Sequence, residues 1–71
     1  MSEIIASMAG NVWKVLVKPG DQVEEDQDVV ILESMKMEIP IAAEFEGTVI
    51  EVKINEGDFV NEGDVIVIVE D

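Results

Sequence analysis

The stretch "AGNVWKVLVKPGDQVEEDQDVVILE", residues 9–33, recurs later in the chain as "EGTVIEVKINEGDFVNEGDVIVIVE", residues 46–70. The two segments align without a gap at an offset of 37, and ten of the 25 aligned positions are identical. A recurrence at a fixed offset indicates one structural unit used twice. The identical pairs are Gly10/Gly47, Val12/Val49, Val15/Val52, Gly20/Gly57, Asp21/Asp58, Val23/Val60, Glu25/Glu62, Val30/Val67, Ile31/Ile68 and Glu33/Glu70.

Each copy has the pattern of strands joined by turns. A glycine-aspartate turn follows the first strand, and a second acidic turn (25–27 or 62–64) leads into the β-branched runs 29–32 and 65–69. Alternation with a period of two places every second residue of a strand on one buried face. The residues predicted to face inward are Trp13, Val15 and Val17, alternating with Lys14 and Lys18, and Ile50, Val52 and Ile54, alternating with Glu51 and Lys53.

Neither copy can bury its apolar face alone, so the two are expected to pack together. The predicted fold is all-β: a flattened β-barrel or sandwich of two four-stranded antiparallel sheets with pseudo-twofold symmetry, a barrel-sandwich hybrid. Residues 4–8 and 37–43 are expected to supply the remaining strands, and residues 1–71 to form one domain. A polar replacement at Val15 or Val52 is expected to cost several kcal/mol, roughly the penalty of an unpaired buried polar group.

The composition excludes several classes of function. The chain has no cysteine, so disulfides, thiolate metal sites and cysteine nucleophiles are impossible. Four lysines and seventeen acidic residues give a net charge of −13, which repels nucleic acid and anionic membranes. Such a charge steers a protein toward basic protein surfaces, although it can also serve only to keep a small protein dissolved. The beginning of the chain lacks the pattern of a secretory signal, and no apolar run is long enough to cross a bilayer, so we expect a cytoplasmic protein.

The segment between the copies breaks local rules. Val29 to Ile39 contains no Gly, Pro, Asn or Asp, yet the chain must reverse there if the copies are to pack. A two-residue hairpin of the twist-compatible type needs positive φ at both central positions. Met35-Lys36 or nearby residues must then adopt this conformation at a cost on the order of 1–3 kcal/mol each. Broken local rules at one defined place point to function.

The sequence "ESMKME", residues 33–38, resembles the modification motif of biotinyl domains. The resemblance extends over almost the whole chain, through "MAGNV" (8–12), "MEIPIAA" (37–43), "EGTV" (46–49) and the two Gly-Asp turns. It implies that a biotin protein ligase joins biotin by an amide to Lys36. The residues implied to assist recognition are Glu33, Ser34, Met35, Met37 and Glu38.

The resemblance also implies a role as a biotin carboxyl carrier. Biotin on Lys36 would shuttle carboxyl groups between a biotin carboxylase and a carboxyltransferase, and the carrier itself would catalyse nothing. The gapless repeat leaves no room for the thumb loop that some bacterial carriers insert in the first copy. We therefore expect a freely mobile arm, and occasional attachment of lipoate.

Other interpretations stay open at this stage. A lipoyl carrier would share the fold, although lipoyl domains usually have Asp-Lys-Ala where this chain has Met-Lys-Met, and an unmodified assembly module would use the same sandwich. An independent enzyme is disfavoured because the chain has no His, Cys, Arg or Tyr. Asp26 and Asp28 have the opening spacing of a calcium loop, but its later ligands are missing, so no metal site is expected. The two methionines could also be core fillers under the hairpin, and Trp13 is expected to be half-buried in sheet packing.

Overall fold

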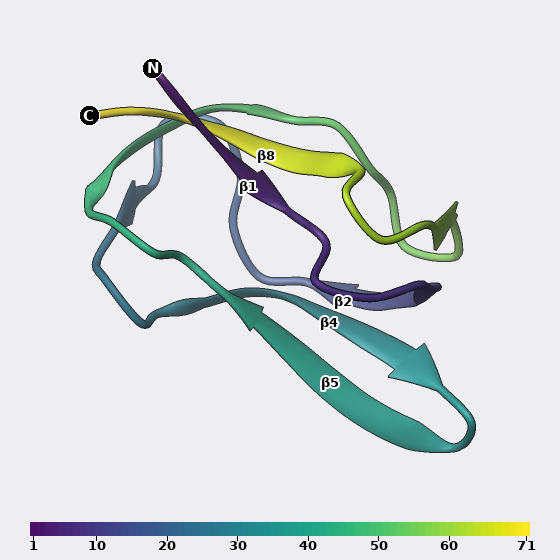
Figure 1. The fold of residues 1–71 in the computed structure, drawn as a ribbon. Coiled ribbons are helices and arrows are strands. Elements are labelled where there is room, and N and C mark those ends of the chain that lie inside the picture. Colours follow the sequence, from purple (N-terminus) through teal and green to yellow (C-terminus); the bar gives the residue numbers. More distant parts are fainter.

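The computed structural model describes residues 1–71 and consists of eight strands (Figure 1). The structure offers no helix with the length and hydropathy required to cross a bilayer. In chain order the strands are β1 (Ser2–Ile5), β2 (Gly10–Val15), β3 (Gln22–Val23), β4 (Asp28–Ser34), β5 (Met37–Ala42), β6 (Gly47–Val52), β7 (Phe59–Val60) and β8 (Val65–Glu70).

The strands form two four-stranded sheets, in the orders β1-β8-β6-β3 and β5-β4-β2-β7, with every pair antiparallel. Each strand of one sheet has its counterpart in the other at the repeat offset, so β1, β8, β6 and β3 correspond to β5, β4, β2 and β7. The predicted fold class, including its pseudo-twofold symmetry, is confirmed. The short strands β3 and β7 each pair with the other copy, which interlocks the two halves.

The core between the sheets is wholly aliphatic. Sixteen buried apolar residues form one cluster, and no polar or charged side chain is buried. Leu32 and its neighbours Val29 and Val30 are fully buried, as are Ile66 and Val67 in the equivalent strand. Burial of such side chains contributes about 1.5–3 kcal/mol each relative to exposure, and this is the main term holding together a chain without disulfides.

A β-bulge in each copy contradicts part of the predicted alternation. The register of β2 against β4 shifts between Val12 and Lys14, and that of β6 against β8 shifts between Val49 and Glu51. Trp13 is therefore the extra residue of its strand and turns outward with 41% of its surface exposed. A bulge inserts one unpaired residue, so the alternation restarts on the opposite face.

Three sequence-based predictions are corrected by this geometry. Trp13 and Ile50 do not belong to the buried face, and the residues buried there are Val12 and Val49, both at most 2% exposed. Val15 and Val52 are only partly buried. The loss of stability expected for a polar replacement therefore applies to Val12 and Val49 instead. The first strand covers Ser2–Ile5 rather than residues 4–8, because the chain bends at 7–8 before entering β2.

Candidate functional site

The hairpin of β4 and β5 extends from the body of the molecule (Figure 1). Its two strands are paired from Asp28↔Ala42 up to Ser34↔Met37, so Met35 and Lys36 alone form the turn. Both have positive φ, 51° at Met35 and 66° at Lys36. This confirms the expectation of a two-residue hairpin with strained central residues. Left-handed backbone at a non-glycine residue costs about 1–2 kcal/mol, so the surrounding ladder must hold the turn in place.

The side chains at the tip face solvent. Met35 is 91% exposed, Met37 is 63% exposed, and Lys36 is exposed as well. The interpretation of the methionines as core fillers is therefore wrong. The two ion pairs of the structure join Met1 to Asp71 and Lys53 to Glu51, which leaves Lys36 without an acidic partner. Its amine is held at the end of a flexible four-carbon stem and is available to a macromolecular partner.

Two glutamates face each other directly below the tip. Glu33 of β4 and Glu38 of β5 are cross-strand partners, and both are exposed. Like charges directly opposite one another destabilise a strand pair, so this arrangement is not explained by the needs of the fold. Sequence reasoning selected both residues from the motif, but their opposition emerges only from the strand register. Ser34, the next residue of β4, is partly buried beside the turn.

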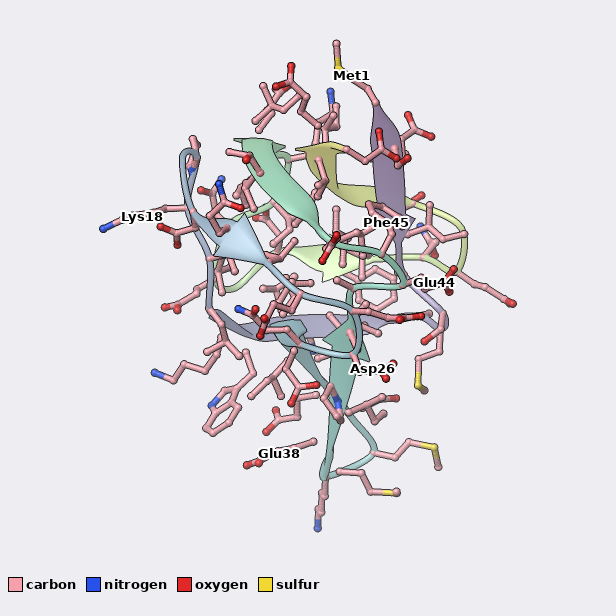
Figure 2. All side chains as sticks on the ribbon, turned by 90° about the vertical axis from the view of Figure 1, so that its left-hand side faces the viewer. Met1, Lys18, Asp26, Glu38, Glu44 and Phe45 are labelled. Carbon is pink, nitrogen blue, oxygen red and sulfur yellow. The ribbon has the colours of Figure 1, made fainter.

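The termini lie at the end of the molecule opposite the hairpin. Figure 2 shows Glu38 near the hairpin end and Met1 at the other end. Ser2 Oγ donates a 2.5 Å hydrogen bond to Asp71 Oδ2, and the Met1 amino group lies 3.4 Å from Asp71 Oδ1. The Ser2 hydrogen bond, the backbone of Asp71 and the amino terminus together hold the pKa of the Asp71 carboxyl below its ordinary value. Because β8 and β1 correspond to β4 and β5, the termini occupy the position that is symmetry-related to the lysine.

Most of the acidic side chains are exposed. No group of three or more carboxylates is placed to hold a metal ion. Asp26, one of the two acids with calcium-loop spacing, adopts a φ of 71° at a turn whose counterpart in the second copy is Gly63. Asp26 therefore lies in an exposed turn, and Lys36 is the exposed lysine with strained backbone.

A two-sheet β-domain that holds a lysine at a strained, exposed hairpin tip defines the class of biotinyl and lipoyl attachment domains. This chain belongs to the biotin/lipoyl family, since the family model described as "Biotin-requiring enzyme" matches residues 1–69. It is 70% identical over 59 residues to a biotin/lipoyl attachment protein of Bacillus subtilis, covering 83% of this chain and 81% of that protein. It is also 48% identical over 59 residues to a biotin carboxyl carrier protein of Streptococcus mutans, covering 83% of this chain and 45% of the relative.

Solved structures show the same architecture. Urea carboxylase from Kluyveromyces lactis matches with a TM-score of 0.90 and 30% identity, over 97% of this chain and 6% of that enzyme. The lipoyl domain of the 2-oxoglutarate dehydrogenase complex from Azotobacter vinelandii matches with a TM-score of 0.72 and 32% identity, over 89% of this chain and 80% of that domain. The same fold therefore occurs in a carboxylase and in a lipoyl domain.

Proposed function

We propose that this protein is a biotin carboxyl carrier whose cofactor is attached to Lys36. The observation that carries the proposal is the position of this lysine, at an exposed tip with positive φ and without an ion-pair partner. Modification would form an amide between Lys36 Nζ and the biotin carboxyl carbon. The leaving group departs from an activated carboxyl and the amine loses a proton. The chain has no histidine and no other suitable general base, so a biotin protein ligase must supply the group that accepts this proton.

Attached biotin supplies the carboxyl-carrying chemistry, and the protein supplies tethering and presentation. A biotin carboxylase would load the biotin with carboxylate using ATP and bicarbonate, and a carboxyltransferase would pass the carboxylate to its acceptor. Tethering makes each encounter effectively intramolecular and so raises the local cofactor concentration. The carrier itself is non-catalytic in this proposal. Residues 1–71 act as one unit, in the cytoplasm where the three partner enzymes would meet it.

The residues around Lys36 would be read by the ligase. Met35 and Met37 present two large, mobile apolar side chains on either side of the amine, which suits a ligase that recognises them in an apolar recess. Glu33, Ser34 and Glu38 extend this surface along the hairpin. The strained turn and the opposed glutamates do not stabilise the fold, and a role in recognition by the ligase accounts for both.

Lipoate attachment is the second candidate. The likeness to the Azotobacter vinelandii lipoyl domain and the double description of the Bacillus subtilis relative favour it. The short connection from Val15 to Gln22 bears no inserted loop that would cover the cofactor. A dual biotin and lipoate acceptor is therefore the alternative to a carrier dedicated to biotin.

Intact-protein mass spectrometry tests the proposal. The protein is co-expressed with a biotin protein ligase in one culture and with a lipoate ligase in another, and each adduct is mapped to a residue. We expect biotin on Lys36, and binding to streptavidin that Lys36→Ala abolishes. Lys18→Ala, which removes another exposed lysine, serves as the matched control and should bind fully. Streptavidin binding that survives Lys36→Ala refutes the attachment site, whereas lipoate as the sole adduct selects the second candidate.

A further inference from the structure

The outer face of the hairpin sheet β5-β4-β2-β7 carries a group of side chains that the core does not use. Residues directly opposite one another on paired strands point to the same side of a sheet. One row runs across all four strands, a second row crosses three of them, and the bulge residue Trp13 lies between the rows on β2. The first row is Phe59, Asn11, Glu33 and Glu38, and the second is Lys14, Ile31 and Pro40.

The pseudo-twofold symmetry provides an internal standard for this face. The outer face of the other sheet has the same strand geometry, so its residues show what the fold accepts at each position. At several positions an aromatic or apolar residue of the hairpin sheet corresponds to a more polar or smaller residue in the other sheet. The pairs are Trp13/Ile50, Phe59/Gln22 and Pro40/Glu3, whereas Ile31 and Ile68 are the same residue in both sheets.

The counterparts of Phe59 and Asn11 form a polar pair. Gln22 Nε2 donates a 3.0 Å hydrogen bond to Thr48 Oγ1 across β3 and β6. The same place on the hairpin sheet holds Phe59 instead, with 61% of its surface exposed. The fold accommodates a glutamine at this position, so folding does not require the exposed phenylalanine. We therefore consider a role for Phe59 in binding a partner.

Trp13 is the second aromatic residue of the face. Lys14 Nζ lies 5.6 Å from the centroid of its ring, within the range of a cation–π contact, which helps to hold the indole against the sheet. With 41% of its surface exposed, Trp13 is already partly packed and so loses less conformational freedom when a partner covers it than a fully exposed side chain does. Tryptophan and other aromatic residues dominate the energetic centres of protein interfaces for this reason.

The charge around these aromatic residues determines what kind of partner fits. Glu33 and Glu38 continue the row of Phe59 and Asn11 across β4 and β5, so they form an acidic border beside the aromatic residues, and the chain as a whole carries a charge of −13. Two copies of such a chain repel one another, so a second copy is not the occupant. The complementary surface is an apolar recess rimmed by lysine and arginine.

The position of the face relative to Lys36 further limits which partner enzyme can bind it. Pro40 lies four residues from Lys36 along β5, which is about 13 Å at 3.3 Å per residue. A ligase must reach the lysine amine itself and therefore sits at the tip. An enzyme that receives the cofactor at the end of its longer arm can instead hold the body of the carrier behind the tip.

On the basis of the proposed carrier function, we propose that this face, centred on Trp13 and Phe59, docks onto the biotin carboxylase that loads the carried biotin. ATP and bicarbonate are anions, so we expect a basic surface around the entrance of that active site, which would suit the acidic border formed by Glu33 and Glu38. Trp13 and Phe59 fill the apolar recess, and the hairpin then points its cofactor toward the bound substrates.

The test exchanges residues between the symmetric faces. In the double variant Trp13→Ile/Phe59→Gln each residue is replaced by the one that the fold accepts at the equivalent position. The control, Ile50→Ala/Gln22→Ala, alters the opposite face. All proteins are biotinylated, their loading is verified by a streptavidin gel shift, and their folding is verified by thermal unfolding. Formation of ADP by the biotin carboxylase of the same organism is then measured against carrier concentration, with saturating ATP and bicarbonate.

We expect the KM for the exchanged carrier to rise about tenfold or more, and the control to match the wild type. The wild-type KM should also rise with added NaCl, because salt screens the acidic border. An unchanged KM for the exchanged carrier, or an equal rise in the control, overturns the proposal. So does a change confined to the KM of the biotin ligase, which would make the ligase the occupant. A wild-type protein that takes no biotin overturns the proposed function and the docking proposal with it.

Discussion

Replacing Met35-Lys36 by Asn-Gly should stabilise the protein while removing Lys36, the proposed attachment site. Both turn residues have positive φ, 51° and 66°, a conformation that costs an ordinary L-residue about 1–2 kcal/mol. Asparagine tolerates this conformation better, and glycine tolerates it without steric cost but loses more entropy on folding. The net gain for the pair is about 1–2 kcal/mol. For a domain of this size, 1 kcal/mol corresponds to a shift in Tm of roughly 4–8 °C, so the double variant should melt about 5–15 °C higher.

Urea unfolding followed by the fluorescence of Trp13, the sole tryptophan, measures this gain. Met35→Asn alone keeps the lysine and should give about half of it. Met37→Asn is the matched control, because Met37 is also exposed but lies in β5 with ordinary strand backbone. This control should give no gain. A double variant that is no more stable than the wild type, at an unchanged m-value, would refute the argument that the turn stores strain for function.

Three further predictions concern the scaffold. Leu32→Ala should destabilise the protein by about 2–5 kcal/mol in urea unfolding, whereas Ile5→Ala, at a position 49% exposed, should change stability by less than about 0.5 kcal/mol; equal effects would contradict the assignment of the core. Gly47→Ala would place a Cβ 2.5 Å from a backbone carbonyl of β8 and should cost about 1–3 kcal/mol, more than Gly10→Ala with its nearest contact at 3.0 Å; the reverse order by calorimetry would show that β6 can move away from β8. Asp71→Asn should lower Tm at neutral pH, because a carboxylate with a lowered pKa stabilises the fold only while it is ionised. The difference in Tm between the variant and the wild type should vanish as the pH falls through the folded-state pKa. A difference in Tm that persists in acid would contradict this.

The sequence alone determined the architecture and the place of the candidate site. A gapless repeat of turns and β-branched runs leaves few arrangements in which both apolar faces are buried, and the two packed sheets follow from it. The absence of turn-forming residues between Val29 and Ile39 predicted that Met35 and Lys36 would take strained backbone, as they do. Both inferences rest on local rules, namely strand periodicity and turn geometry, which are readable from the residue order.

Which residues face outward was decided by the tertiary structure. Alternation predicts which residues face the core only while each residue of a strand pairs with one residue of its partner. The bulges at Trp13 and Ile50 add one unpaired residue each and so shift the alternation. A bulge depends on the register between strands far apart in the chain, so no local pattern predicted it. The same register sets Glu33 opposite Glu38 and brings β3 and β7 into the sheets of the opposite copy. The lysine tip could therefore be located from the sequence, whereas the aromatic face behind it emerged only once the strands were paired.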